Sequence, residues 1–406
     1  MNRVLDVIAG SSKSPSSRLP LCLVVGAASL GSFAFLRAIR SSLHTGESRA
    51  TLSPTESVLP FLRQEETNNL PYPPDALPGA RDVPSPFGSI RVYEWGPEHG
   101  EKVLLIHGIS TPAIALGGLA DQLVEKGCRV MLFDLFNRGY SSGPSPDTHR
   151  YDSGLYTSQI LTCLCSSPLP WTAKPFTIIG YSLGGALAAD FTSYFPNLIR
   201  GLILVAPGGL IRTSHITWKS RLLYSSRGII PEWLIHKMVA GRLWTGPDVA
   251  RSIEPEPDLA AVSLNESKGG LRSQAVYTSS HTTLLPDNPN STVGKVVDWQ
   301  IQYHKGFVPA FVSTIRHAPI HEQQPRWRVV GENMNKGRCP LRRVDIILGE
   351  TDPIIVAEEI VEDAKEVLGE EYLRVKLVRG SGHEVAIDRP DIIVRTVGQV
   401  FGYDDW

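Results

Sequence analysis

The chain has 406 residues, of which 42% are hydrophobic and 20% charged, so it can bury a full core and is long for one simple domain. A formal net charge of -1 leaves no basic surplus for nucleic acid, and no lysine-rich or aromatic-basic motif appears. Five scattered cysteines, an odd number, argue for buried thiols and against a disulfide framework. We therefore expect one large α/β domain with an insertion.

The N-terminal region divides into a polar segment, residues 1–18, and an uncharged apolar segment, residues 19–36. The apolar run is just long enough to span a bilayer, and arginines on both sides can reach the interfaces. A secretory signal peptide is the competing interpretation, but the apolar core begins late and no clean A-x-A site follows it. We expect an uncleaved, single-pass transmembrane anchor, in a membrane and an orientation that the sequence leaves open.

Residues 37–86 are rich in serine, proline, threonine and glutamate. They show no sustained apolar period, which is typical of segments that cannot bury enough apolar surface to fold. This composition predicts a flexible linker, which would let a globular head stand away from the membrane.

Apolar strands and helices alternate from residue 87 onward. We expect strands at 90–95, 103–106, 129–134, 176–179 and 201–206, with helices at 113–126 and 151–165. Strands separated by helices predict parallel β-α-β units and a sheet that helices cover on both faces. Residues 87–209 would then form the first part of the core.

The alternation stops after residue 209. Residues 210–340 have helical spacing at 214–242 and 296–316 around a polar, irregular stretch, which predicts an inserted helical cap. Residues 341–406 then complete the core, with strands at 344–348 and 373–378 and helices at 357–368 and 389–401.

The stretch Phe176 to Leu187 carries the pattern G-x-S-x-G at Gly180 to Gly184. Its front half is suited to a buried strand, and its back half is small and tolerates a helix. The pattern demands a strand that turns sharply into a helix, with glycines beside a serine that is held in a strained conformation. A tight turn with a spare serine is the alternative, because five-residue patterns recur by chance.

Three chemically distinctive residues directly follow predicted strands: Ser182, Asp352 in G-E-T-D-P, and His383 in G-S-G-H-E. Sites in open parallel sheets form at the carboxyl ends of strands, so we expect these side chains to meet. A weak hydroxyl nucleophile needs a base to take its proton, and the base needs an acceptor that fixes its tautomer. The order Ser, Asp, His is the one expected for an elbow serine enzyme.

With this ordered set the chain resembles the α/β-hydrolase fold family, over about residues 87–403. The resemblance rests on His107-Gly108, the loop Asp134 to Ser141, the pattern Gly180 to Gly184, Gly349 to Pro353, and Gly382-His383. It implies an α/β fold, with a mainly parallel β-sheet covered by helices on both faces and an inserted helical cap. It also implies a capped, esterase- or lipase-like serine hydrolase.

Roles for individual residues follow from the same resemblance. It implies Ser182 as nucleophile, His383 as general acid and base, and Asp352 as the orienting acid. The backbone N–H groups of Ile109 and Leu183 would form the oxyanion hole. The sequence agrees with each assignment, since the start of a helix turns the Leu183 N–H toward developing negative charge.

Neighbouring residues allow other interpretations. We expect His107 to be a structural hydrogen-bonding residue. The loop Asp134 to Ser141 departs from the commoner D-x-R-G-x-G-x-S by an asparagine before its arginine, and we expect it to be a scaffold for the elbow. Glu350 lies two residues before Asp352 and is an alternative acid, but Asp352 is followed by proline and an apolar run, as in the family loop.

Hydrolysis of a carboxylic ester through an acyl-enzyme is the function we expect. The same triad could cleave an amide, a thioester or a carbon–carbon bond, and the cap does not decide between them. A noncatalytic binding protein of this fold is the rival from another class, but no damage to the triad is visible. No metal-ligand set, Rossmann pattern or phosphate loop appears, so we expect no cofactor, no metal and a small-molecule ester or acyl partner.

The first half of the predicted cap is unusually apolar and aromatic: Trp218, Leu222, Leu223, Tyr224, Trp233, Leu234, Ile235, Met238 and Trp244. Most of these side chains should pack the cap against the core, and a minority should line the pocket. The composition favours a lipophilic ester or acyl substrate.

Overall fold

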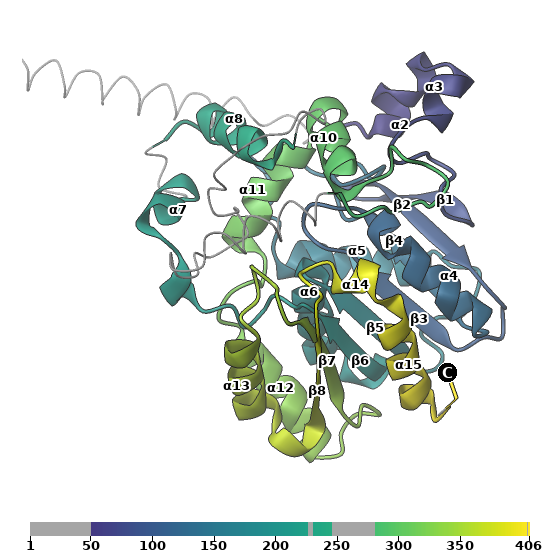
Figure 1. Ribbon diagram of the computed structural model, residues 1–406, viewed down its shortest axis with the longest axis vertical. Coiled ribbons are helices and arrows are strands. Elements are labelled where there is room, and N and C mark those ends of the chain that lie inside the picture. The colour runs from purple at the N-terminus through teal and green to yellow at the C-terminus, as the bar shows by residue number, and fades with distance from the viewer. Residues whose placement is uncertain (1–49, 226–229, 246–280, 404) are drawn as a thin grey trace, which may run out of the picture. The chain divides into compact units, whose positions relative to one another are not determined.

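Eight strands form one sheet in the order β1-β2-β4-β3-β5-β6-β7-β8 (Figure 1). The computed structural model describes residues 50–225, 230–245, 281–403 and 405–406. β2 is antiparallel to both of its neighbours, β1 and β4, and every other pair is parallel. The strands are β1 (Ala80–Ser85), β2 (Gly88–Trp95), β3 (Lys102–Ile106), β4 (Arg129–Phe133), β5 (Phe176–Tyr181), β6 (Ile199–Val205), β7 (Val344–Gly349) and β8 (Leu373–Val378).

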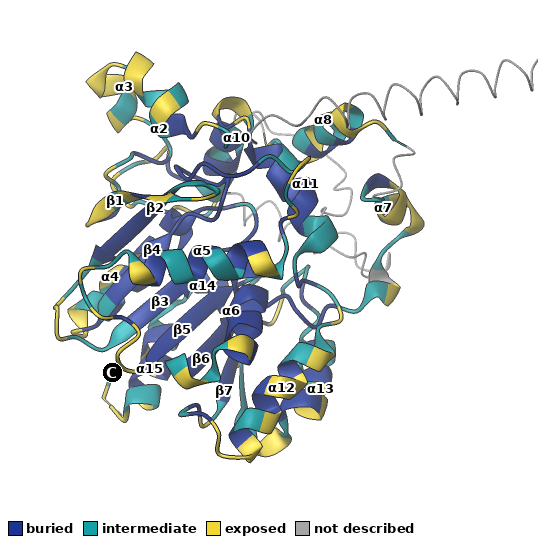
Figure 2. Cartoon of the chain, turned by 180° about the vertical axis from the view of Figure 1, so that it is seen from behind, coloured by how far each residue is buried: buried dark blue, intermediate teal, exposed yellow. Residues whose placement is uncertain are grey.

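Helices cover both faces of the sheet (Figures 1 and 2). One face carries α4, α14 and α15, and the other carries α5, α6 and α12, with α13 packed against α12 and β8. The core helices are α4 (Gly117–Glu125), α5 (Ser153–Cys165), α6 (Leu183–Tyr194), α12 (Gln324–Asn335), α13 (Ala357–Leu368), α14 (Val385–Asp388) and α15 (Pro390–Phe401). The predicted α/β-hydrolase architecture is confirmed, and α13 and β8 have their predicted bounds.

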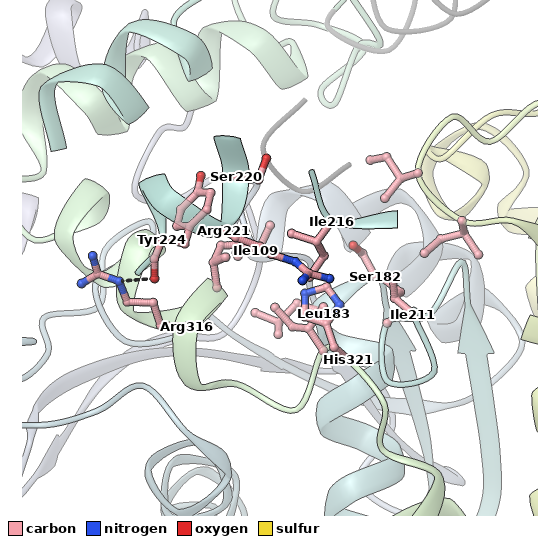
Figure 3. Close-up of a pocket in the computed structure, with 15 residues that line it drawn as sticks. Ile109, Ser182, Leu183, Ile211, Ile216, Ser220, Arg221, Tyr224, Arg316 and His321 are labelled. Carbon is pink, nitrogen blue, oxygen red and sulfur yellow. Dashed lines mark hydrogen bonds between the residues drawn. The ribbon is translucent and has the colours of Figure 1, made fainter. Parts of the chain in front are cut away.

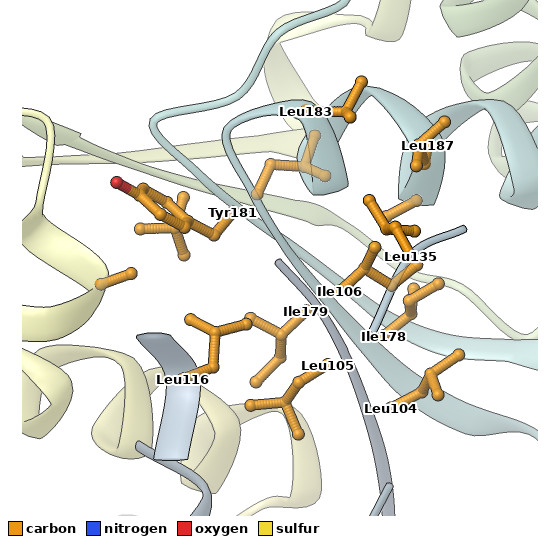
Figure 4. Packing of buried hydrophobic residues seen from close by; sticks show 14 of the residues in the cluster. Leu104, Leu105, Ile106, Leu116, Leu135, Ile178, Ile179, Tyr181, Leu183 and Leu187 are labelled. Atoms are coloured by element: carbon orange, nitrogen blue, oxygen red, sulfur yellow. The ribbon is translucent and has the colours of Figure 1, made fainter. Parts of the chain in front are cut away.

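β5 lies inside the sheet between β3 and β6, and all six of its residues are buried. Its register pairs Ile178 with Leu104 and Ile179 with Leu105. Because paired residues of parallel strands share a face, Ile178 and Leu104 point toward Leu187 of α6, and the other pair points to the opposite face (Figure 4). Burial on both faces explains why this strand reads as a continuous apolar run.

The structure differs from the predicted flexible linker over residues 50–86. Two short helices, α2 (Pro54–Ser57) and α3 (Gln64–Asn68), precede β1, which forms a hairpin with β2 at the edge of the sheet. Tyr72 is completely buried, and its hydroxyl lies 2.7 Å from that of Tyr93. Proline is tolerated in an edge strand, so the composition of this segment concealed a strand that contains Pro84.

The predicted polar terminus and anchor, residues 1–18 and 19–36, lie outside the described residues. The predicted linker lies outside them up to residue 49. Across the part of the chain that the structure describes, no helix combines the length and apolar character needed to cross a bilayer.

The segment between β6 and β7 contains the predicted helical cap. Its described helices are α7 (Trp218–Leu223), α8 (Glu232–Leu243), α10 (Val293–Tyr303) and α11 (Phe307–His317), and α8, α10 and α11 pack against one another. α12 differs from the prediction, because it packs against α6 and α13 and so covers the sheet. The cap therefore ends before α12 and not at residue 340.

The turn from β5 to α6 leaves no room for a side chain on either side of Ser182. A Cβ atom at Gly180 would lie 2.2 Å from the carbonyl oxygen of Gly184, and one at Gly184 would lie 2.0 Å from that of Ile106. Both obstructions are backbone atoms of buried elements, which cannot swing aside as the end of a side chain can. Glycine at these two positions therefore fixes where the strand ends and the helix begins.

We predict that Gly180→Ala lowers the free energy of unfolding by roughly 2–4 kcal/mol, because a strand or helix must shift to admit the methyl group. The melting temperature should fall accordingly. Gly118→Ala is the matched control, since nothing lies within 4 Å of the added Cβ in α4. It should leave stability unchanged or raise it by about 0.5–1 kcal/mol. Equal melting temperatures for the two variants would contradict this account of the turn.

Candidate active site

Ser182 occupies a strained backbone position between β5 and α6. Its φ of 54° and ψ of -117° lie outside the usual regions for a non-glycine residue. Its N–H donates to the carbonyl of Val205 at 2.9 Å, and its own carbonyl accepts from Gly185 at 2.9 Å and Gly208 at 3.0 Å. These three bonds, together with the flanking glycines, hold the strain in place and fix the direction of the hydroxyl.

His383 and Asp352 complete a hydrogen-bonded chain with Ser182. The Nε2 atom of His383 lies 3.0 Å from the Ser182 Oγ, and its Nδ1 atom lies 2.8 Å from the Asp352 Oδ2. The side chains of His383 and Asp352 are 8% and 1% exposed. A ring whose Nδ1–H donates to the carboxylate has Nε2 free to accept a proton from the serine. The structure thus brings all three predicted side chains together.

The loops after β7 and β8 hold Asp352 and His383 against each other. The Asp352 Oδ1 atom accepts the N–H groups of Ile354 at 2.7 Å and Ile355 at 2.9 Å, which fixes the carboxylate plane. A Cβ at Gly349 would lie 2.1 Å from the carbonyl oxygen of Gly382, so the two loops approach as closely as backbone allows. The close approach of these two loops therefore sets the distance between Asp352 and His383.

Glu350, the alternative acid, lies away from His383. Its side chain is exposed, and its Oε2 accepts the N–H of Gly380 at 3.0 Å, in the loop that leads to the histidine. The carboxylate that bonds to His383 is that of Asp352. Glu350 instead ties the two loops together.

His107 fixes the peptide group between Gly108 and Ile109. Its Nδ1 lies 2.7 Å from the Gly108 carbonyl oxygen, and its Nε2 accepts the N–H of Leu135 at 2.9 Å. Burial lowers the pKa of His107 to about 3, so the ring is neutral and Nδ1 is the donor. In a trans peptide the N–H points opposite to the C=O, so the Ile109 N–H is turned away from His107.

Ile109 and Leu183, the predicted oxyanion donors, line the same cavity as Ser182. Within the described residues neither backbone N–H donates to a protein acceptor, and the Leu183 N–H is at the first position of α6, where helices leave donors unpaired. Two free donors beside a nucleophile are the arrangement that stabilises an oxyanion.

The loop Asp134 to Ser141 is a buried scaffold, as expected. The Asp134 carboxylate accepts the N–H groups of Ala113 at 2.8 Å and Tyr140 at 2.9 Å, and burial raises its pKa to about 7. The unusual Asn137 adopts a left-handed conformation with φ of 56°, which asparagine tolerates better than most residues. None of these groups lines the cavity beside Ser182.

Two cap helices are fastened to this scaffold by residues that sequence analysis did not identify. Gln300 of α10 accepts the N–H of Gly139 and donates to the carbonyl of Ser110, both at 2.8 Å. Arg138, completely buried, donates to the carbonyl of Ile109 and to the hydroxyl of Thr314 in α11, both at 3.0 Å. No local motif marks a glutamine or threonine in a cap, so only the fold could reveal these contacts.

A cavity of about 270 Å³ opens above Ser182 between the sheet and the cap (Figure 3). Its wall is mainly isoleucine, from the sheet-edge loops and from the cap: Ile109, Ile211, Ile216, Ile315, Ile320, Ile354 and Ile355. Of the predicted cap aromatics, Tyr224 lines the cavity, whereas Trp218 and Trp233 are 72% and 67% exposed. The isoleucines, not the tryptophans, make the site apolar.

The described residues contain no group of three or more histidine, cysteine, aspartate or glutamate side chains that could hold a metal ion. The four cysteines among them, Cys128, Cys163, Cys165 and Cys339, are free thiols. The polar side chains that line the cavity among the described residues are those of Ser182, Ser220, Arg221, Tyr224, Arg316 and His321.

Solved structures with the same fold include esterases and a phospholipase. The chain superposes on a membrane phospholipase A with a TM-score of 0.52 and 14% identity, over 96% of this chain and 98% of that one. It superposes on the carboxylesterase CesB from Bacillus subtilis with a TM-score of 0.51 and 14% identity, over 79% of this chain and 90% of that one. Identities this low show the fold alone.

Several curated relatives are named serine hydrolase-like proteins. The one from Danio rerio is 30% identical over 131 residues, which is 32% of this chain and 38% of that protein. One from Homo sapiens is 30% identical over 145 residues, or 36% of this chain and 68% of that protein. The match thus spans well under half of the zebrafish protein.

A family model confirms what the motifs and the sheet order indicate. Residues 102–390, more than half of the chain, match the model of the alpha/beta hydrolase fold. That range begins at β3 and includes the elbow, the cap and both loops that carry Asp352 and His383. The chain therefore belongs to the alpha/beta hydrolase fold family.

Proposed function

We propose that this protein is a serine hydrolase that cleaves carboxylic esters through Ser182, His383 and Asp352. The observation that carries the proposal is the continuous hydrogen-bonded chain, 2.8 Å from Asp352 to His383 and 3.0 Å from His383 to Ser182, beside an apolar cavity. The names of the curated relatives support it. A noncatalytic binding protein would have no need of a strained serine in line with a base.

In the first half of the reaction, the Ser182 oxygen attacks the ester carbonyl while its proton passes to the Nε2 atom of His383. The carbonyl oxygen becomes an oxyanion between the N–H groups of Ile109 and Leu183. Collapse of the tetrahedral intermediate breaks the bond to the alcohol, which takes the proton from His383. The acyl group remains bonded to Ser182.

Water completes the cycle. His383 takes a proton from the water as its oxygen attacks the acyl carbonyl, and the same two N–H groups bind the second oxyanion. The carboxylic acid leaves as Ser182 recovers its proton from His383. Asp352 keeps the Nδ1–H tautomer and stabilises the imidazolium in both halves, but it takes no proton itself.

The isoleucine wall supports an apolar acyl or alcohol group in the substrate. Burying one additional methylene contributes about 0.8 kcal/mol, or roughly a fourfold gain in kcat/KM for each carbon until the cavity is full. The same residues could cleave an amide, a thioester or a carbon–carbon bond, but no feature of the cavity favours one of these over an ester.

We also propose that the apolar run at residues 19–36 tethers the enzyme to a membrane. The support is the sequence alone: an uncharged segment of spanning length with arginines on both sides. A tethered enzyme would meet lipophilic esters where they concentrate.

We predict that Ser182→Ala lowers ester hydrolysis by about 10⁴-fold or more and abolishes covalent labelling by a fluorophosphonate probe. Ser158→Ala is the matched control, because its hydroxyl donates only within α5, to the carbonyl of Leu155. That variant should retain wild-type activity and labelling. Labelling of the Ser182→Ala protein at the wild-type rate would contradict the assignment of the nucleophile.

We predict that Asp352→Asn lowers kcat by about 10³- to 10⁴-fold without unfolding the protein, because an amide cannot hold the Nδ1–H tautomer as the carboxylate does. Glu350→Gln, which alters an exposed carboxylate two residues away, should change kcat less than about tenfold. Steady-state kinetics with a short-chain ester and a circular dichroism spectrum test both. The reverse ranking would assign the acid to Glu350.

We predict that the full chain stays in the membrane pellet after extraction with alkaline carbonate. The variant Val24→Asp/Leu30→Asp should move to the supernatant, since each charge at the centre of a spanning helix costs about 2.5–3.5 kcal/mol. Immunoblots of both fractions provide the measurement. Wild-type protein recovered wholly in the supernatant would refute the tether.

A further inference from the structure

The apolar cavity above Ser182 also contains two arginine side chains, Arg221 at the end of α7 and Arg316 in α11. No aspartate or glutamate is among the described residues that line it. Guanidinium groups remain charged at every physiological pH, so each must be balanced by a protein anion, by solvent or by a ligand. The two arginines differ in how this balance is met.

Arg316 is balanced within the protein. Its Nη1 lies 3.1 Å from both carboxylate oxygens of Glu232 in α8, and its Nε donates to the carbonyl of Tyr224 at 3.1 Å. Its side chain is only 11% exposed. This arginine therefore joins α11 to α8 and to the end of α7.

Arg221 has no carboxylate partner among the described residues. Within the described residues its hydrogen bond runs from Nη2 to the carbonyl of Thr213 at 3.1 Å, and its other N–H donors are available to solvent or to a ligand. The Glu322 carboxylate binds the N–H and hydroxyl of the same threonine and makes no ion pair with Arg221. His321 also lines the cavity, and burial lowers its pKa below the ordinary value, so the imidazole adds no further cation at neutral pH.

We propose that Arg221 binds an anionic group at the non-reacting end of the substrate. The inference rests on the proposed ester hydrolysis and narrows its substrate class to esters that carry a carboxylate or a phosphate beyond an apolar segment. Ser182 enters the cavity from the sheet and Arg221 from the cap (Figure 3). The ester carbonyl would then lie at the sheet, the apolar segment along the isoleucines, and the anion at the cap.

The surroundings of Arg221 suit this role. A guanidinium presents paired N–H donors that match the geometry of a carboxylate or phosphate. The Arg221 residue is exposed, so solvent screens part of its charge, and a charge pair with the bound substrate would contribute modestly, on the order of 1 kcal/mol or about fivefold in kcat/KM. A neutral ester of the same length would fill the same isoleucine wall but would gain nothing from Arg221.

The test compares matched esters on the full-length protein. One series consists of p-nitrophenyl monoesters of dicarboxylic acids, which keep a terminal carboxylate, and its control series ends in a methyl group at the same chain length. A parallel pair of series places the carboxylate on the alcohol. The wild type should have a higher kcat/KM for carboxylate-ended esters in at least one pair, and added sodium chloride should weaken that preference.

Arg221→Gln should lower kcat/KM for the preferred anionic ester by about fivefold or more and leave the methyl-ended ester unchanged. Arg221→Lys should keep part of the preference, because it keeps the charge but loses the paired donors. Lys219→Gln removes an exposed charge from the same helix and should alter neither series. Melting temperatures of the variants confirm that each is folded.

The possible results distinguish a failure of the role of Arg221 from a failure of the proposed ester hydrolysis. Hydrolysis of neutral esters with no preference for an anion, or equal losses in both series for Arg221→Gln, would overturn the role of Arg221 alone. No hydrolysis of any ester together with no fluorophosphonate labelling of Ser182 would overturn the proposed function, and the role of Arg221 with it.

Discussion

The close approach of backbone to backbone at the end of β5 is the constraint on which the rest of the site depends. A strand buried on both faces must turn into α6 within one residue, and two glycines allow it only by leaving out their side chains. Ser182 then takes the conformation that the turn requires, at a cost of about 1–3 kcal/mol. The hydrogen-bonded sheet stabilises this conformation, so the position of the Ser182 hydroxyl is set by the fold itself.

Buried polar groups fix the loops that surround the end of the sheet. The neutral ring of His107 orients one peptide, the Asp134 carboxylate ties two loops, and Arg138 joins the oxyanion loop to the cap. Each of these groups is completely or almost completely buried. A group that lost its protein partner would therefore have no water molecule to replace it. Satisfying all of them at once selects one arrangement of the loops.

The sequence predicted the parts of this protein that are specified locally. Short-range patterns define strand β8, helix α13 and the elbow. Recognisable short motifs directly after strands contain Ser182, Asp352 and His383. It did not predict the burial of Tyr72 or the roles of Gln300 and Thr314, because those depend on contacts with residues far away in the chain. The end of the cap was misplaced for the same reason, since the packing of α12 against α6 and α13 joins residues far apart in the chain.

The attachment of α10 and α11 to the core limits how freely this cap could be exchanged for another. Gln300 satisfies the N–H of Gly139 and the carbonyl of Ser110, while Thr314 accepts from the buried guanidinium of Arg138. A foreign cap that lacked these two side chains would leave one donor of the buried guanidinium and two backbone groups without these partners, at a cost of about 1–3 kcal/mol for each buried group left unpaired. The cap helices α10 and α11 are therefore tied to the loops around Ser110 and Arg138, and the pocket of this chain could be altered with less cost through α7 than through replacement of the whole insertion.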